Sequence, residues 1–165
     1  MFTPAQLGVI QYCAIECDRQ GSGELSVNDM LAGWQHASLA LGWKRKVDIE
    51  FILELGRKVE PEDNKNGFRT VPIYVGNGWD NKPIGSPAAE IERHLALLIE
   101  AYYDGTLVPA QPLAKTAEDQ FYFEYEGIHP FRDGNGRTGK ILYNYLRDTM
   151  KLPEFPPNFW GISNP

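Results

Sequence analysis

The chain has 165 residues, of which 42% are hydrophobic and 23% charged, a composition that suits one globular domain with its own core and excludes the disordered and membrane classes. Its formal net charge of −6 at pH 7 argues against a broad basic surface for nucleic acid. The first residues lack the charged and apolar regions of a signal peptide, and no apolar run approaches membrane-spanning length. We therefore expect a cytoplasmic protein with no nucleic-acid or membrane partner.

Helical periodicity dominates the sequence and is interrupted once. Apolar residues recur at helical spacing in six segments, residues 4–17, 27–41, 47–59, 91–102, 113–125 and 135–150. Between the third and fourth segments, β-branched residues, prolines and glycines in residues 67–87 predict a β-hairpin at an edge. The pattern predicts an all-α fold, a helical bundle with one β-hairpin.

The segment between the first two predicted helices loosely resembles a calcium-binding EF-hand loop. Residues 18–29 place oxygen-bearing side chains at alternate positions, with Gly23 in sixth place. Gln20 and Ser22 are poor ligands, however, and Asp29 is shorter than the glutamate that usually closes such a loop. A weak structural calcium site and a simple connection between helices both stay open.

The chemically richest segment is residues 129–140, His-Pro-Phe-Arg-Asp-Gly-Asn-Gly-Arg-Thr-Gly-Lys. Pro130 disfavours helical backbone at His129 and predicts an extended residue that projects its imidazole from a loop. Gly134 and Gly136 permit positive φ and leave N–H groups uncovered where the last helix begins, which favours an anion. A base, a carboxylate and an anion cradle in one loop indicate a phosphate site with proton-transfer chemistry.

The same residues match most of a Walker A loop, which is the competing nucleotide-binding interpretation. Ile141 stands where that loop needs a Ser or Thr hydroxyl for Mg²⁺. Too few residues follow Ile141 to build the parallel sheet that such a loop requires. We therefore interpret the Walker A match as accidental.

The segment as a whole resembles the signature of the Fic family, H-P-F-x-[DE]-G-N-G-R-x-x-R, and departs from it only at Lys140, which replaces the final arginine. Gly67, Phe68 and Arg69 ahead of the hairpin also fit the family's order of elements. The resemblance implies one Fic-like domain over residues 1–165, with N-terminal helices in 1–45, a Fic core in 46–160, a hairpin flap in about 67–87 and the motif in 129–140.

The resemblance implies a protein adenylyltransferase, which moves AMP from Mg·ATP to a Tyr, Ser or Thr hydroxyl of a target protein and releases pyrophosphate. His129 would take the hydroxyl proton, Asp133 would hold Mg²⁺, and Arg137 would also steady the leaving pyrophosphate. The nucleotide phosphates would be bound by Gly134, Asn135, Gly136, Arg137 and Lys140. The target would align along the flap by strand addition, at Val71, Ile73, Tyr74 and Val75.

Lys140 leaves the identity of the donor open, because lysine keeps the positive charge of arginine but loses its planar fork. Two alternatives therefore stand beside AMP transfer. One is another Fic-type transfer, of UMP, phosphocholine or phosphate. The other is a nucleotide-binding interaction module whose chemistry has lapsed.

Many Fic proteins are silenced by a glutamate in the pattern [ST]-x-x-x-E-[GN], which pairs with the final arginine of the motif. The pattern is absent from this sequence, because the one glutamate followed by Gly or Asn is Glu126 and Tyr122 precedes it by four residues. Either a separate inhibitory, antitoxin-like protein supplies the inhibition, or the enzyme is regulated in another way, and we expect the former.

Overall fold

The computed structural model describes residues 1–74 and 82–158, and it confirms a mainly helical fold with one small hairpin. The helices of this part of the chain are α1 (Pro4–Arg19), α2 (Glu24–Gly42), α3 (Ile49–Val59), α4 (Ile91–Tyr103), α5 (Ala117–Ile128) and α6 (Asn135–Leu146). A 3-10 turn, η1 (Ala88–Glu90), leads into α4. The two strands are β1 (Ile73–Tyr74) and β2 (Pro83–Ile84).

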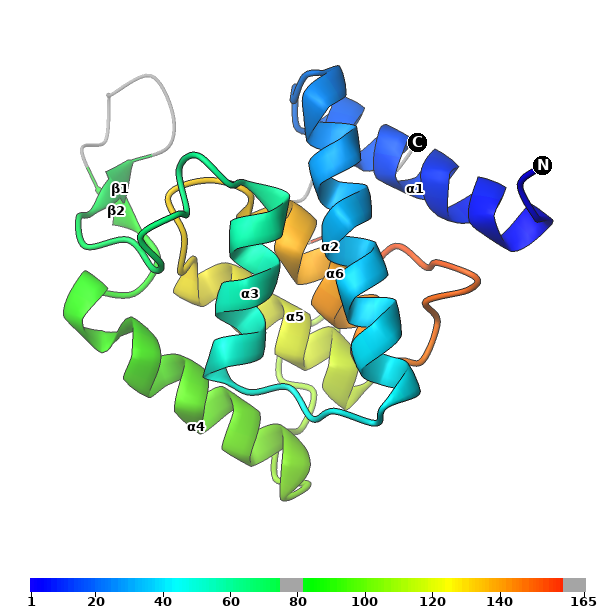
Figure 1. Cartoon of the computed structure of the whole chain (residues 1–165). Helices are drawn as coiled ribbons and strands as arrows, with labels where there is room; N and C mark the ends of the chain where they lie inside the picture. The colour runs from blue at the N-terminus through cyan, green and yellow to red at the C-terminus, as the bar shows by residue number, and fades with distance from the viewer. Residues whose placement is uncertain (75–81, 159–165) are drawn as a thin grey trace.

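Helix α6 lies at the centre of the bundle, where it packs against α2, α3 and α5 (Figure 1). Helix α1 packs on α2, and its N-terminal half projects away from the body on the side opposite the hairpin (Figure 1). The fully buried large side chains between the helices include Met30, Phe51, Ile52, Leu55, Phe121, Tyr125, Phe131, Ile141 and Leu142. The motif at the start of α6 is thus held by the main core.

Side-chain caps decide where several helices begin. Thr3 and Gln6 form a capping box at the start of α1, and the Asp48 side chain accepts a hydrogen bond from the Phe51 N–H at the start of α3. Thr116 and Asp119 cap α5 in the same way as α1, so this helix begins four residues later than the apolar pattern predicts. The last helix ends at Leu146, short of the predicted residue 150.

The connection between α1 and α2 does not have the form of an EF-hand loop. Helix α1 continues to Arg19 and α2 begins at Glu24, so Asp18 and Asp29 lie within helices and only residues 20–23 separate them. Among the described residues, no group of three or more His, Cys, Asp or Glu side chains is placed to hold a metal ion. The calcium interpretation therefore finds no support in the geometry.

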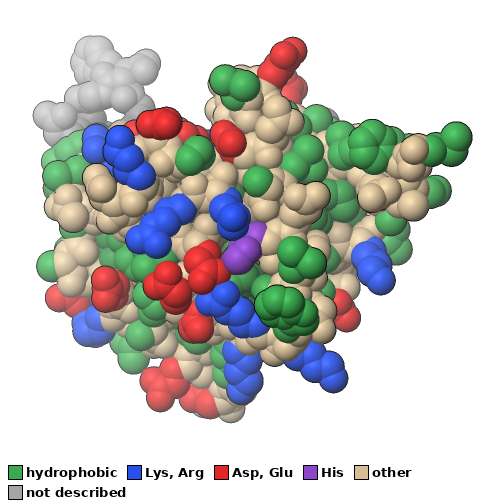
Figure 2. Space-filling model, viewed as in Figure 1, with side chains coloured by type: hydrophobic (Ala, Val, Ile, Leu, Met, Phe, Trp, Pro, Cys, Tyr) green, Lys and Arg blue, Asp and Glu red, His purple; other side chains and the backbone are tan. Residues whose placement is uncertain are grey.

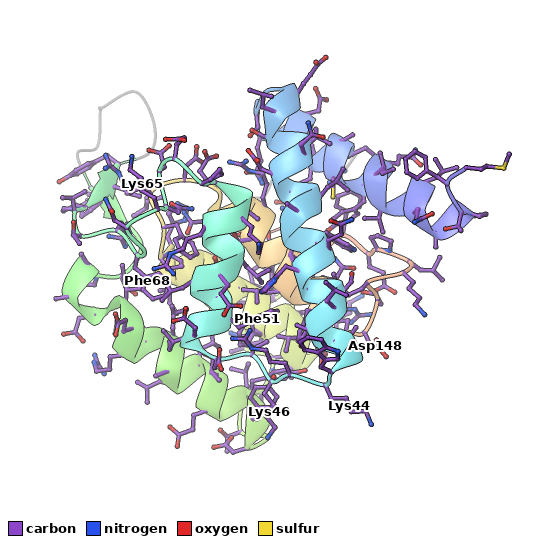
Figure 3. The ribbon with its side chains drawn as sticks, viewed as in Figure 1. Lys44, Lys46, Phe51, Lys65, Phe68 and Asp148 are labelled. Atoms are coloured by element: carbon purple, nitrogen blue, oxygen red, sulfur yellow. The ribbon has the colours of Figure 1, made fainter. Side chains whose placement is uncertain are left out.

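The hairpin pairs β1 and β2 in antiparallel register, with Ile73 opposite Ile84. The predicted turn and Val75 lie outside the described residues. Phe68, which lies between α3 and the hairpin (Figure 3), packs its ring 5.2 Å from that of Phe131. The base of the flap is therefore anchored on the motif loop.

Charges of both signs are interspersed on the face shown in Figure 2, so this face carries no field of a single sign. Arg45 and His36 both contact Glu54, which joins the end of α2 to α3. Within residues 1–74 and 82–158, no helix is long and apolar enough to cross a bilayer.

Candidate active site

His129 ends α5 in a left-handed conformation, with φ 53° and ψ 63°. The predicted extended backbone is therefore wrong. Pro130 excludes the right-handed helical region for the residue before it, and the left-handed region satisfies that limit while closing the helix. The His129 N–H donates to the Tyr125 carbonyl at 3.0 Å, as a C-terminal cap requires.

The environment of His129 favours a neutral imidazole. Burial lowers its pKa below the ordinary value of 6.5, and the positive charge of Arg69 lowers it further. The backbone carbonyl of Glu126 and the charge of Asp133 act in the opposite direction but are outweighed. A neutral imidazole at pH 7 is the form that can accept a proton from a hydroxyl.

Asn135 and Phe131 fix the shape of the loop. The Asn135 side chain accepts from the Phe131 N–H at 2.8 Å and donates to the Phe131 carbonyl at 2.9 Å. The Phe131 ring is fully buried and presses on Gly56, where an added Cβ would lie 2.1 Å from its Cζ. The Asn135 side chain thus closes the loop on itself, and the binding of phosphate by Asn135 stays a prediction.

The two motif glycines differ in conformation and in surroundings. Gly134 has φ +73° and is the N-cap of α6, as its predicted conformational freedom requires. Gly136 lies inside α6 and does not adopt the positive φ that glycine permits. An added Cβ at Gly136 would lie 2.5 Å from the Gln20 Nε2 atom. The end of α1 therefore overhangs the N-terminus of α6, where an anion is expected.

Asp133 and Arg137 meet on the α3 side of the loop. Arg137 is 1% exposed, and its Nη2 lies 2.8 Å from Glu60 Oε2 and 3.5 Å from Asp133 Oδ1. Its Nη1 donates to the Val59 carbonyl at 3.3 Å. The Asp133 side chain is 61% exposed, and the Asn64 amide donates to its backbone carbonyl at 2.9 Å. Asp133 is therefore a fixed, accessible carboxylate, whereas the fork of Arg137 is engaged by the end of α3.

Lys140 is paired with a residue that the sequence interpretation missed. Its Nζ lies 2.9 Å from Oε1 of Glu16 on α1 and donates to the Tyr122 hydroxyl at 3.2 Å. Glu16 is only 1% exposed, and the Gln20 amide donates to the same carboxylate oxygen. The signal in the sequence was a charged residue on the face that Tyr12 and the two cysteines bury. The family's inhibitory pattern does not describe it, because Tyr12 and Cys17 occupy its Ser/Thr and Gly/Asn positions.

Glu126 is a second buried acid beside Lys140. It is 3% exposed, and its Oε1 has no hydrogen-bond partner in the described part of the chain. Burial raises the pKa of this carboxyl to about 7, and the charge of Glu16 adds to the rise while Lys140 opposes it. The carboxyl groups of Glu16 and Glu126 therefore both lie near the Lys140 ammonium in the absence of a bound phosphate.

The described flap residues leave an exposed edge. Val71 and Tyr74 are 48% and 59% exposed, and Ile73 is half-buried. Strand addition by a target needs such an accessible edge.

Comparison with known proteins agrees with this geometry. The family model described as "Fic/DOC family" matches residues 46–146, and the chain therefore belongs to the Fic/DOC family. It is 30% identical over 116 residues to protein adenylyltransferase fic-1 of Caenorhabditis elegans, covering 68% of this chain and 21% of that protein. It is 31% identical over 127 residues to protein adenylyltransferase Fic of Drosophila melanogaster, covering 74% of this chain and 24% of that protein.

The solved structure of C. elegans Fic-1, residues 134–508, has the same fold. Its TM-score is 0.60 at 24% sequence identity, with 80% of this chain and 38% of that chain covered. The chain spans less than a quarter of the length of the two curated relatives named above.

Proposed function

We propose that this chain transfers AMP from ATP to a Tyr, Ser or Thr hydroxyl of a target protein and releases pyrophosphate. One observation carries the proposal: a single loop places a half-buried imidazole, whose pKa is lowered, at the end of α5 beside the N-terminus of α6. The similar proteins named as adenylyltransferases support AMP as the transferred group.

In the proposed reaction, His129 accepts the proton of the target hydroxyl as its oxygen attacks the α-phosphorus. The bond from that phosphorus to the oxygen of the pyrophosphate breaks, and the pyrophosphate leaves with the electron pair. The N–H groups at the start of α6 stabilise the developing negative charge. Positioning and electrostatic stabilisation supply most of the catalysis of such a transfer.

Asp133 fits the role of a magnesium ligand. Its carboxylate is accessible and fixed, and nucleotide-bound Mg²⁺ needs one or two protein carboxylates beside phosphate oxygens and water. When bound, Mg²⁺ would offset the charge of the phosphates. The chain's contribution there is a carboxylate held next to the phosphate cradle.

The pairing of Glu16 with Lys140 favours regulation of nucleotide binding by a segment of this chain, helix α1. In the family the final basic residue of the motif holds the terminal phosphate, and here its charge is already neutralised at 2.9 Å. Gln20 covers Gly136 in addition. We infer that α1 restrains nucleotide binding, whereas a separate antitoxin-like partner and a cytoplasmic location stay predictions from the sequence.

The test uses ATP labelled on the α- or the γ-phosphate, incubated with the Glu16→Gln chain, Mg²⁺ and a protein extract. Transfer of the α-label alone, abolished by His129→Ala but not by His36→Ala, is the expected result. Transfer of the γ-label would indicate phosphate transfer instead. ATP binding without any transfer would favour the lapsed module, and label that survives His129→Ala would refute the assigned base.

A further inference from the structure

Arg69 is a buried cation whose partners are all backbone carbonyls in the described part of the chain. It is 3% exposed and makes no ion pair with a described residue. Its Nε donates to the His129 carbonyl at 2.7 Å, and its Nη1 donates to the Val71 carbonyl at 3.1 Å. Its Nη2 donates to the Ser86 carbonyl and lies 3.4 Å from the Ile128 carbonyl.

Burial of an arginine without an acid is costly, and desolvation lowers the pKa of Arg69. The cost is limited here because four carbonyls lie within hydrogen-bond distance of the guanidinium nitrogens. The planar fork offers five N–H donors spread in a fixed geometry over three nitrogens and can reach carbonyls of several segments at once, whereas lysine offers three donors on one nitrogen. The backbone N–H of Arg69 adds one more bond, to the Pro130 carbonyl at 3.0 Å.

These bonds join both ends of the flap. Val71 precedes β1 and Ser86 follows β2, so a single guanidinium closes the base of the hairpin. The Ser86 N–H also donates to the Ile128 carbonyl at 2.9 Å. Gly85 is so close to the catalytic loop that an added Cβ would lie 2.8 Å from the His129 Cβ.

The Ser86 side chain is held from the α4 side. Its Oγ lies 2.6 Å from His94 Nδ1, and Arg93 Nη2 lies 3.1 Å from His94 Nε2. Arginine can only donate, so Nε2 accepts and the imidazole proton is placed on Nδ1. His94 therefore donates to Ser86, which fixes the hydroxyl as a structural acceptor and not as an activated nucleophile.

The same guanidinium holds the backbone of the base. His129 is in the left-handed region, which a residue with a side chain adopts only when its surroundings fix it. Its carbonyl accepts from Arg69 Nε, and the preceding and following carbonyls also bond to Arg69. Three successive peptide groups around the imidazole are thus oriented by one residue.

We propose that Arg69 is a positioning residue that locks the flap and the backbone of His129 into one unit, so that a target strand bound along the flap meets the imidazole at a fixed distance. The function of this positioning role of Arg69 rests on the proposed AMP transfer, whereas the contacts of Arg69 do not depend on it. The test can therefore be made on the chain without nucleotide or target.

The test compares Arg69→Lys and Arg69→Gln with the wild type, and uses Arg57→Gln on the exposed face of α3 as the control. Amide hydrogen exchange of Ser86 reports the tie between flap and loop, and NMR titration of the His129 imidazole reports its electrostatic environment. Both Arg69 variants should speed Ser86 exchange by about tenfold or more relative to the control. Arg69→Gln should also raise the pKa of His129, because it removes a charge that lowers it, whereas Arg69→Lys should not.

Wild-type Ser86 exchange in both variants would overturn the proposal, as would a His129 pKa unchanged by Arg69→Gln. A chain that fails to fold with Arg69→Lys would overturn it too, because Arg69 would then be a requirement of the whole domain. If these results hold but no label is transferred from ATP, the proposed function fails and the positioning role stands.

Discussion

Replacement of Glu16 by glutamine should strengthen ATP binding. The Glu16–Lys140 pair joins groups whose side chains are 1% and 15% exposed, so solvent screens their attraction little. A hydrogen bond to a charged group is worth about 1.5–3 kcal/mol. A phosphate that no longer competes with this carboxylate should bind about 10- to 150-fold more tightly.

Glu126 determines where in that range the result falls. The charge of Glu16 helps to hold the pKa of Glu126 near 7, so Glu16→Gln should lower that pKa and leave Glu126 charged at neutral pH. Glu126 would then replace Glu16 in part as the counterion of Lys140. The single variant should therefore fall at the low end of the range and the double variant Glu16→Gln/Glu126→Gln at the high end.

The assay is isothermal titration calorimetry with Mg·ATP at pH 7.5, in a His129→Ala background that prevents turnover. Glu100→Gln, an exposed change on α4, is the matched control and should leave the affinity unchanged. An affinity within twofold of the background for both the single and the double variant would refute the view that α1 restrains the phosphate site.

Three further predictions concern pH and packing. The kcat/KM of transfer should fall on acidification with a midpoint below pH 6.5, because the base is active when deprotonated and burial lowers its pKa in the free chain; a midpoint above 6.5 would contradict this. Glu126 has a pKa of about 7 when folded and an ordinary value of 4.5, so the stability it contributes below pH 4.5 is lost as pH rises through 7. Glu126→Gln should therefore stabilise the chain against urea by about 2–3 kcal/mol at pH 8 and by less at pH 5, and an equal gain at both would refute the assignment. Gly56→Ala should cost about 3 kcal/mol, because its Cβ would lie 2.1 Å from the Phe131 ring, whereas Gly8→Ala, which meets nothing within 4 Å, should be stabilising in the same denaturation assay.

The sequence was sufficient for features that local pattern controls. Apolar spacing located all the described helices, and Gly134 adopts the positive φ that the motif analysis allowed for it. Helix ends were less accurate, since Thr116 moves the start of α5 by a cap that periodicity does not include.

The features that the sequence did not predict depend on contacts between distant segments. Lys140 is paired because Glu16 arrives from α1, and the Gln20 side chain from the end of the same helix covers Gly136. The backbone of His129 is held in part by Arg69, sixty residues earlier in the chain. Periodicity and motif spacing carry no information about contacts between residues far apart in the sequence, because these contacts form only when the helices pack.

Because Glu16 lies near the C-terminal end of α1, the two ends of this helix have different surroundings: one contacts Lys140 and the other faces solvent. From Thr3 to Glu16 the helix rises about 20 Å at 1.5 Å per residue, and its far end stands clear of the bundle, with Phe2 and Leu7 62% and 53% exposed. We therefore expect a partner that binds this exposed end of α1 to weaken the Glu16–Lys140 contact at the other end of the same helix.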